Sequence, residues 1–425
     1  MQYKKEEPMK LSEIIEVFIS GDWGNESSSP EAPCAVSCVR GADIVPISNN
    51  EFADIPLRYV SSRSFQQKTL RVGDIVVEKS GGSPSQSTGR VVYISQDLLS
   101  ALTNVVCSNF CVAFRVKEGW NSYFIYQYWQ YLYSNGVFFN FEGKTSGIKN
   151  LQLDIALSTI EIEAYPIKTQ TSIANCLEAI EDKIALNRSI NHNLEAMAKQ
   201  LYDYWFVQFD FPDENGRPYK SSRGKMVWNA TLKRDIPEGW EVANIRRVLD
   251  KVITTPRVST AEYLQAGSYP VIDQTTDVYC AGFTERQDAV VNQYPAVVFG
   301  DHSCAVKYVN FPFARGADGT QVILSKEKNI SIEYLYCFMK DVKIKKGYAR
   351  HFGFLKEHPI ILPSETEAKK FQGTVQILFE QITRNRKENL SLTRLRDELL
   401  PLLMNGQVSV NYDLVILCYV EFSLP

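Results

Sequence analysis

The chain has 425 residues, of which 44% are hydrophobic and 12% aromatic, and this composition excludes an intrinsically disordered protein. The length is too great for one ordinary hydrophobic core and predicts about two or three domains. The net charge of −3 at pH 7 disfavours a protein that coats nucleic acid through bulk positive charge, so any basic surface must be local.

Cysteine usage and hydropathy predict a cytoplasmic protein. The nine cysteines, at positions 34, 38, 107, 111, 176, 280, 304, 337 and 418, form no dense disulfide framework, and the first ten residues lack the apolar core of a secretory signal. No apolar run approaches the roughly 20 residues that a membrane-spanning helix needs. We therefore expect a cytoplasmic location and no membrane partner.

Residues 1–167 are expected to form a mixed α/β domain. Four of its cysteines, Cys34, Cys38, Cys107 and Cys111, form two C-x3-C pairs that could hold zinc through four thiolates. Both pairs lie among apolar residues, however, where buried free thiols are common. The sequence therefore favours free thiols, and we predict no metal site.

Two segments carry a local excess of positive charge. Residues 58–90 contain Arg58, Arg63, Lys68, Arg71, Lys79 and Arg90 against Asp74 and Glu78, and residues 343–356 contain Lys343, Lys345, Lys346, Arg350 and Lys356 with no acid. A solvated surface and a binding surface for an acidic partner explain such runs about equally well.

Residues 168–206 are expected to form one long helix, because apolar residues recur at alternate steps of four and three, the heptad pattern of a coiled-coil seam. The seam comprises Ile173, Leu177, Ile180, Ile184, Asn187, Asn191, Leu194, Ala198, Leu201 and Trp205. Adding 198 to each number gives a second seam, in a helix expected over residues 364–407. Its members are Phe371, Val375, Leu378, Ile382, Asn385, Asn389, Leu392, Arg396, Leu399 and Leu403.

The repeat extends beyond the helices. Strand-like runs ending at Pro166 and Pro363 precede them, and YFIYQYWQ (123–130) corresponds to EYLYCFMK (333–340), while GDIVVEKS (73–80) aligns less securely with PAVVFGD (295–301). Residues 207–235 are rich in glycine, proline and charged residues, which predicts a linker. Residues 236–363 are therefore expected to form a second mixed α/β domain.

Two asparagines interrupt each seam at matching depth. A polar side chain in a seam costs stability but penalises every register that leaves it unpaired, so two related seams in one chain are expected to bury each other. In an antiparallel pair, the two residue numbers of each facing pair add to 576, which places Asn187 opposite Asn389 and Asn191 opposite Asn385. Only Ile180 opposite Arg396 matches poorly. A parallel pair also aligns the asparagines, so the seams alone leave both orientations open.

The common catalytic motifs are missing from the sequence. GGSPSQSTGR (81–90) has neither the spacing nor the lysine of a phosphate-binding P-loop, and no GxGxxG follows a strand. Glu78 and Lys79 are adjacent on a predicted strand and point to opposite faces, unlike the carboxylate and lysine of a metal-dependent nuclease. Histidines at 192, 302, 351 and 358 form no motif for nucleophilic catalysis. We predict no catalytic residue.

The chain resembles the specificity subunit of a type I restriction-modification system. The resemblance is carried by the duplicated layout of domain and helix, by SGIKNLQL (146–153), by LYDYWFVQFDFPDENGRPYKSSRGKMVW (201–228) and by IPEGWEV (236–242). It implies an α+β protein in which two mixed α/β target-recognition domains are separated by two long helices, packed as an antiparallel coiled coil with a pseudo-two-fold internal repeat.

The resemblance also implies function. Each recognition domain would read one half of a bipartite target in double-stranded DNA, and the helices would set the gap. The chain itself would bind no cofactor. Partner modification subunits would methylate adenine with S-adenosylmethionine, and restriction subunits would use ATP and Mg for translocation and cleavage.

DNA-contacting residues are expected in four loops that carry forked, amide, hydroxyl or cationic side chains. They lie at 79–90, 143–150, 300–307 and 345–351, and the candidates are Lys79, Ser80, Ser85, Gln86, Arg90, Lys144, Lys149, Asn150, His302, Ser303, Lys307, Lys346, Arg350 and His351. Any one of them is more often a neutral loop position than a base contact.

The C-terminal segment departs from the family pattern. Residues 408–425 form an apolar tail that continues past LLPLLMNGQVSV (399–410), where chains of this family usually finish. Its strand-like run could cover a sheet edge or be an out-of-frame extension.

Two other functions stay open. One is a recognition subunit of a related fused or solitary restriction system, and the other is a coiled-coil protein scaffold that does not bind DNA.

Overall fold

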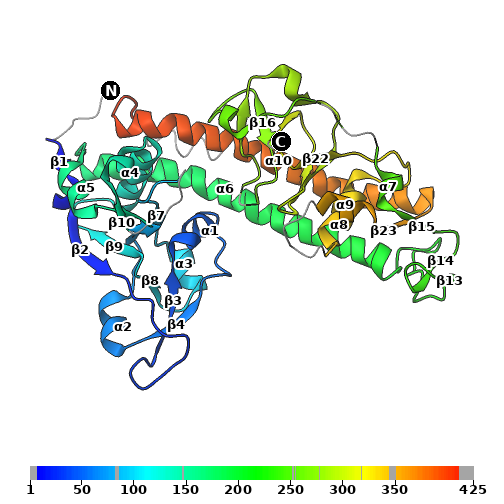
Figure 1. Ribbon diagram of the computed structural model, residues 1–425, viewed down its shortest axis with the longest axis horizontal. Coiled ribbons are helices and arrows are strands. Elements are labelled where there is room, and N and C mark those ends of the chain that lie inside the picture. The colour runs from blue at the N-terminus through cyan, green and yellow to red at the C-terminus, as the bar shows by residue number, and fades with distance from the viewer. Residues whose placement is uncertain are drawn as a thin grey trace. The chain divides into compact units, whose positions relative to one another are not determined.

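The computed structural model describes residues 7–81, 86–145, 148–250, 253, 255–276, 278–316, 318–343 and 351–410 (Figure 1). The chain divides into two compact units: unit 1 is Met1–Ala185 with Ser391–Pro425, and unit 2 is Leu186–Leu390. Each unit contains small sheets, short helices and one segment of each long helix, α6 (Ile167–Tyr202) and α10 (Glu365–Met404). The predicted mixed class with long helices is confirmed. The predicted domain boundaries stay predictions, since the division into units cuts both long helices.

Unit 1 is built around an antiparallel sheet with the strand order β2 (Ile15–Ser20), β9 (Cys111–Val116), β5 (Ile75–Glu78) and β7 (Val91–Tyr93). A second sheet has the order β4 (Leu57–Val60), β3 (Cys34–Val39) and β8 (Val105–Cys107). A third has the order β10 (Glu142–Thr145), β11 (Ile148–Leu151) and β6 (Ser80–Gly81), and β1 (Met9–Lys10) pairs with β12 (Glu161–Ile162). The helices are α1 (Ile44–Ser48), α2 (Ser62–Lys68), α3 (Gln96–Ala101), α4 (Ser122–Ser134) and α5 (Leu153–Thr159).

Aromatic packing holds α4 in unit 1. The helix begins where the Asn121 side chain accepts a hydrogen bond from the amide of Phe124 at 2.9 Å, a favourable N-cap. Its Trp129 ring stacks on Phe138 at 4.6 Å between centroids and donates its indole N–H to the carbonyl of Gly89 at 2.8 Å. The polar atom of this buried side chain is thereby satisfied.

Unit 2 contains a sheet with the order β17 (Gly282–Thr284), β16 (Tyr269–Ile272), β21 (Phe313–Arg315) and β18 (Val290–Val291). A second sheet has the order β20 (Val306–Val309), β19 (Ala296–Gly300) and β22 (Thr320–Ile323), and β15 (Glu241–Asn244) pairs with β23 (Pro359–Leu362). The helices are α7 (Ile245–Val248), α8 (Ile332–Asp341) and α9 (His351–Lys356). A hairpin that the sequence analysis missed overlaps the C-terminal end of the predicted linker and pairs β13 (Met226–Asn229) with β14 (Arg234–Pro237).

The internal repeat is visible in the topology of the two units. The strand that precedes each long helix pairs antiparallel with the strand that opens its own domain, β12 with β1 in unit 1 and β23 with β15 in unit 2. The segments aligned at 123–130 and 333–340 both lie in helices, α4 and α8. The α/β region of each unit therefore closes on itself immediately before its long helix.

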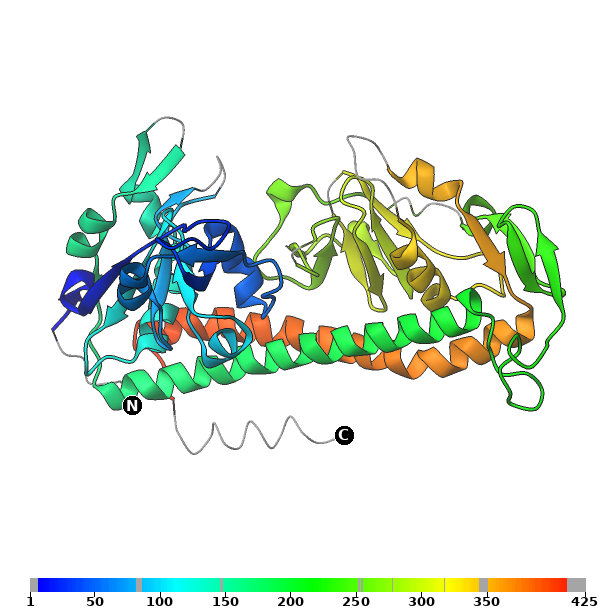
Figure 2. The same cartoon turned by 90° about the horizontal axis from the view of Figure 1, so that it is seen from below.

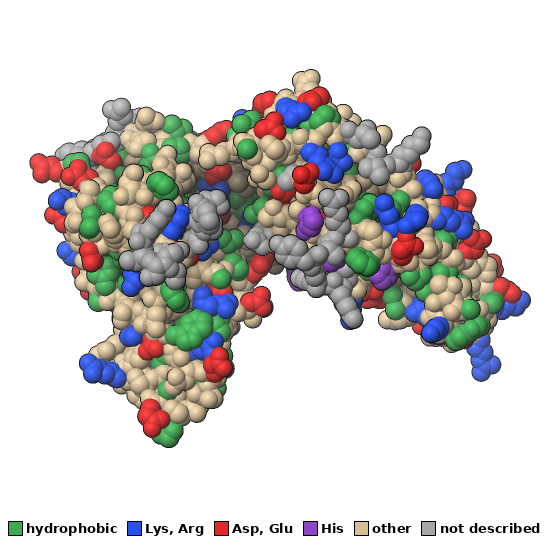
Figure 3. Space-filling model, in the orientation of Figure 1, with side chains coloured by type: hydrophobic (Ala, Val, Ile, Leu, Met, Phe, Trp, Pro, Cys, Tyr) green, Lys and Arg blue, Asp and Glu red, His purple; other side chains and the backbone are tan. Residues whose placement is uncertain are grey.

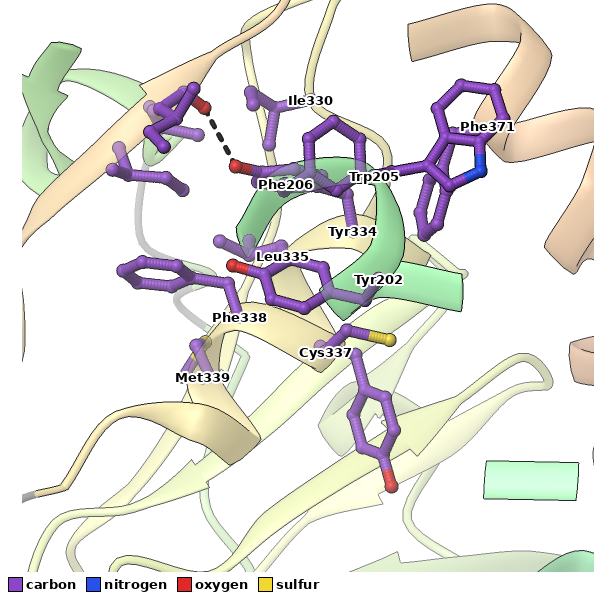
Figure 4. Packing of buried hydrophobic residues seen from close by; sticks show 14 of the residues in the cluster. Tyr202, Trp205, Phe206, Ile330, Tyr334, Leu335, Cys337, Phe338, Met339 and Phe371 are labelled. Atoms are coloured by element: carbon purple, nitrogen blue, oxygen red, sulfur yellow. Dashed lines mark hydrogen bonds between the residues drawn. The ribbon is translucent and has the colours of Figure 1, made fainter. Parts of the chain in front are cut away.

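The aromatic residues at the C-terminal end of α6 join the core of unit 2 (Figure 4). The Phe206 ring meets Tyr334 edge-on at 4.5 Å and Phe371 at 4.8 Å, and Trp205 lies 5.6 Å from Phe371. These side chains come from α6 and its π-helical extension Asp203–Val207, from α8 and from α10. Burial of four large rings at one junction fixes both long helices on the α/β region of this unit.

The long helices contact each other in opposite chain order within unit 2, where Figures 1 and 2 show their segments side by side. Asn187 donates its amide to the side-chain oxygen of Asn389 at 2.9 Å, and Asn385 donates to Asn191 at 2.8 Å. The two residue numbers of each pair add to 576, as the antiparallel register predicts, and Trp205 with Phe371 follows the same rule.

Unit 1 follows the same register. Ile180, Ile184 and Leu392 form one buried cluster against which Leu399 packs. The poor match predicted between Ile180 and Arg396 is relieved, because the Arg396 guanidinium turns to Glu181 at 2.8 Å and to Asp397 at 2.7 Å. The apolar residue therefore stays buried beside an ion pair.

All the predicted seam residues are buried or half-buried, but the buried surface of α10 is wider than a single seam. Phe379, which the seam omits, is 1% exposed and packs on Tyr308 at 4.6 Å and Tyr336 at 5.6 Å. α10 therefore buries a second row of side chains against β20 and α8.

The part of the chain with described coordinates contains no helix that is both long and apolar enough to span a bilayer. Of the predicted tail, residues 411–425 lie outside the described residues.

Candidate nucleic-acid interface

The first predicted loop region of unit 1 lies where β5, β6 and β11 meet. Lys79 follows β5 and is exposed, and Ser80 begins β6. The hydroxyl of Ser80 hydrogen-bonds the side-chain oxygen of Asn150, which pairs with it across the β6–β11 ladder. Two segments that are 70 residues apart in the sequence are thus joined into one surface.

Arg90 is engaged inside unit 1. Its guanidinium forms a two-pronged ion pair with Glu78, at 2.8 and 2.7 Å, and donates to the carbonyl of Gly41 at 2.9 Å. Hydrogen bonding to Glu78 raises the pKa of Arg90. The Glu78 side chain is only 4% exposed, so Arg90 neutralises a buried carboxylate. This arrangement argues against the DNA contact predicted for Arg90.

Lys149 is also paired. Its ammonium lies 3.3 Å from Glu142, donates to the carbonyl of Gln86 at 3.2 Å and sits 5.9 Å from the centre of the Phe139 ring. Glu142 in turn accepts the amide of Thr88 at 2.7 Å. Lys149 therefore pins the end of the glycine-rich loop to β11, while the side chain of Gln86 is exposed.

The ion pairs of unit 1 show which basic residues remain available. Arg58 pairs with Glu26 at 3.1 Å and lies 4.5 Å from the Trp23 ring, and Lys68 pairs with Asp22 at 3.6 Å. Among the described part of the chain, three exposed cations of the 58–90 segment form no ion pair: Arg63, Arg71 and Lys79. The basic excess is thus partly structural and partly free for an anionic ligand.

In unit 2, Gln274 joins the loops that follow β16, β19 and β21. Its side chain accepts the amide of His302 at 3.2 Å and donates to the carbonyl of Asp318 at 2.9 Å. Its own carbonyl accepts the hydroxyl of Ser303 at 2.6 Å. His302 is exposed at the tip of this assembly. The sequence analysis missed Gln274, because nothing in its neighbourhood marks it as a connector of distant loops.

Lys307 and His351 are buried, which argues against the DNA contacts predicted for them. Lys307 is 7% exposed, and its ammonium donates to the carbonyls of Val278 at 2.8 Å and Tyr279 at 3.2 Å. Burial lowers its pKa to about 8, although Asp273 lies 3.9 Å away. His351 is 2% exposed and opens α9 by donating its amide to the carbonyl of Asp301 at 2.9 Å.

Four candidates cannot be placed. Ser85, Lys346 and Arg350 lie outside the described residues, as does the side chain of Lys144 on β10. The DNA contacts predicted for Lys79, Ser80, Gln86, Lys149, Asn150, His302 and Ser303 stay predictions.

A buried charged network joins the long helices to the α/β region of unit 2. The guanidinium of Arg386 on α10 lies 2.7 Å from Glu195 on α6 and 4.3 Å from the centre of the Tyr279 ring, and it donates to the carbonyl of Tyr308. Desolvation opposes the charged guanidinium, but the surrounding acidic and phenolic groups raise the pKa of Arg386. Arg386 therefore connects three elements, a role that the seam pattern does not indicate.

No group of three or more His, Cys, Asp or Glu side chains with metal-binding geometry occurs among the residues for which coordinates are described. The cysteines of the two C-x3-C pairs are free thiols. Burial raises the pKa of Cys38 to about 12 and that of Cys111 to about 11, which disfavours the thiolate that zinc requires. On the face shown in Figure 3, Lys and Arg side chains are interspersed with Asp and Glu over each unit.

A family model described as "Type I restriction modification DNA specificity domain" matches residues 4–196 and 237–393. The type I restriction enzyme MjaIX specificity subunit of Methanocaldococcus jannaschii is 24% identical over 399 residues, covering 87% of this chain and 88% of the relative. The HindI specificity subunit of Haemophilus influenzae is 23% identical, covering 85% and 92% of the two chains. A crystal structure of the type I S subunit from M. genitalium is similar with a TM-score of 0.50 at 14% identity, covering 95% and 96%, which indicates a shared fold.

Proposed function

Because the chain belongs to the type I restriction modification DNA specificity family, we propose that its two recognition domains read the two halves of a bipartite DNA target. The chain is a type I specificity subunit with two copies of the specificity domain. In this proposal α6 and α10 form one antiparallel coiled coil that separates the two readers and fixes the gap between the half-targets.

One observation carries the proposal: the family model matches twice, and each match combines an α/β region with most of the predicted seam of the long helix that follows it. The asparagine pairs of unit 2 and the apolar cluster of unit 1 support the antiparallel arrangement, because both obey one register. Buried amide pairs are a known device for selecting one register in a coiled coil. A helix of 36 residues is about 54 Å long at 1.5 Å per residue, which is on the scale of one to two turns of B-DNA.

The catalytic partners of this chain are part of the proposal. Modification subunits would methylate adenine with S-adenosylmethionine, and restriction subunits would translocate and cleave DNA with ATP and Mg. The specificity subunit would bring both to the target and would itself contribute binding surfaces. Arg63, Arg71, Lys79 and His302 are exposed and offer hydrogen-bond donors to phosphates or base edges.

The experiment is to express the chain with its modification subunits and to sequence the methylated adenines of the host DNA. The proposal predicts one motif made of two specified parts with a constant gap. Methylation with no motif, or a motif without a gap, would contradict it. Salt-dependent retention of the full chain on duplex DNA separates it from a protein scaffold, because phosphate contacts release counterions and a scaffold has none.

A further inference from the structure

Phe110 is a large apolar side chain that unit 1 holds rigidly in solvent. It is 56% exposed in the short connection between β8 and β9. Its carbonyl accepts the amides of Lys79 at 2.9 Å and Ser80 at 3.0 Å. Two neighbouring hydrogen bonds to one carbonyl fix the backbone from which the ring projects.

The same connection is also held from the other side. Ser108 donates its amide to the carbonyl of Val39 at 2.8 Å, and the amide of Cys111 closes a turn on the carbonyl of Ser108 at 2.9 Å. Gly21 packs so closely on this turn that a Cβ there would lie 1.9 Å from the carbonyl oxygen of Ser108. Single exposed apolar residues are common on proteins, but a rigidly mounted one needs little ordering entropy on binding.

Hydrogen bonds connect Phe110 to a band of polar residues. Ser80, whose amide bonds Phe110, hydrogen-bonds Asn150 through its hydroxyl, and Asn109 beside Phe110 is exposed. We call Phe110, Asn109, Lys79, Ser80 and Asn150 the Phe110 band. It places an aromatic ring, two amide side chains, a hydroxyl and an ammonium within one stretch of surface.

The charge of the band comes from Lys79. The neighbouring cations Arg90 and Lys149 are neutralised by Glu78 and Glu142, whereas Lys79 forms no ion pair within the described part of the chain. The ring of Phe110 and the ammonium of Lys79 belong to two segments whose backbones are hydrogen-bonded to each other. An apolar ring and a cation on neighbouring segments fit a ligand that carries both phosphates and apolar groups such as thymine methyls, as duplex DNA does.

We propose that the Phe110 band is a DNA-reading surface of the first recognition domain, in which Phe110 makes an apolar base contact and Lys79 a phosphate contact. The inference rests on the proposed function and goes beyond it, because it assigns a residue that determines specificity. Phenylalanine contacts thymine methyl groups in the major groove or wedges between base pairs in the minor groove. Either contact carries sequence preference, whereas the Lys79 contact does not.

The test uses the full chain bound to its modification subunits, with the target motif taken from methylated-adenine sequencing of the wild type. Binding is measured for the target duplex and for duplexes in which one half-target is scrambled. Phe110→Ala should weaken binding to the target about tenfold and should leave binding to a duplex lacking the relevant half unchanged. Phe110→Leu, which keeps an apolar side chain, should lose less.

Lys79→Met should behave differently. It should weaken binding to all duplexes alike and lower the slope of log K against log salt by about 0.9, the value for one phosphate contact. Phe18→Ala is the matched control, because Phe18 is 46% exposed on β2 of the same unit and pairs with Phe114 of β9, which is not a member of the band. It should change neither affinity nor salt dependence.

The outcomes of these experiments distinguish a failure of the inference about the Phe110 band from a failure of the proposed function. If the wild-type complex methylates a bipartite motif but Phe110→Ala binds it normally, the inference is wrong and the proposed function stands. If Phe110→Ala weakens all duplexes equally or lowers the melting temperature, the ring has a structural or non-specific role and the inference is again wrong. If the wild type has no motif, the proposed function itself fails.

Discussion

At the scale of single residues, several of the cationic side chains of this protein form ion pairs with its own carboxylates. Glu78 at the end of β5 is 3% exposed and would be unstable there as an unpaired carboxylate. Arg90 supplies the compensating charge through two hydrogen bonds. The cations that remain exposed, such as Lys79, are therefore the ones to test for ligand binding.

Replacing Arg90 tests whether this cation stabilises the fold, in contrast to the exposed cations. Arg90→Met should lower the free energy of unfolding by about 3 kcal/mol, because it leaves the Glu78 carboxylate buried without its partner. Denaturant unfolding of the purified chain measures the change. Arg71→Met, which removes an exposed unpaired cation from the same segment, should change stability by less than about 0.5 kcal/mol. Equal effects of the two substitutions would contradict the buried-pair interpretation.

The lowered pKa of Lys307 predicts that the free energy of unfolding depends on pH. Its folded pKa is about 8, below the ordinary value of 10.5, so between these pH values the unfolded chain binds a proton that the folded chain has released. Stability rises with pH wherever the unfolded state binds more protons, so the penalty for burying Lys307 is full below pH 8 and is relieved towards pH 10.5. The relief is about 3 kcal/mol at most.

The measurement compares wild type with Lys307→Met by urea unfolding at several pH values. The free energy of unfolding of the wild type should rise relative to the variant between pH 8 and 10, since other titrating groups cancel in the difference. A difference that is constant over this range would show that Lys307 does not titrate abnormally.

At the scale of elements, the heptad pattern predicted α6 and α10 and the residues of their buried seams. It missed Phe379, because a heptad seam describes the contact between two helices and not the additional contact of α10 with β20 and α8. It also missed the hairpin of β13 and β14, because its short strands lie among glycine, proline and charged residues that are typical of a linker. Loop residues were harder to predict still: the pairing of Lys149 with Glu142 depends on the register of β10 and β11.

The buried pair of Asn191 and Asn385 predicts how substitutions in the two long helices change stability. Asn191→Leu should destabilise the chain by about 1–3 kcal/mol, because the buried N–H donor of the Asn385 side chain loses its acceptor. The double variant Asn191→Leu with Asn385→Leu should recover most of that loss, since two apolar side chains can replace a buried polar pair. Asn193→Leu on the exposed face of α6 is the control. A double variant that loses the sum of the single effects would contradict the pairing.

At the scale of the whole molecule, the internal repeat gives units 1 and 2 the same strand pairing. The strand pairings β1 with β12 and β15 with β23 repeat the same closure in each unit. The sequence alignment of the two halves predicted a strand before each long helix but not its pairing partner. The orientation of the helices could not be predicted from the seams, because the asparagines align in both parallel and antiparallel pairs. Contacts such as Ile184 with Leu392 in unit 1 and Asn191 with Asn385 in unit 2 favour the antiparallel register.

The most direct test of the central claim is a distance between the N-terminal turns of the two long helices. Spin labels are introduced at the exposed residues Lys168 and Lys369 through an unnatural amino acid, since the chain has nine cysteines, and their separation is measured by pulsed electron resonance. In the antiparallel register Lys369 lies opposite position 207, so the account predicts a separation of about 60 Å at 1.5 Å per residue. A separation of roughly 10–15 Å, the spacing of labels on adjacent turns of packed parallel helices, would contradict it.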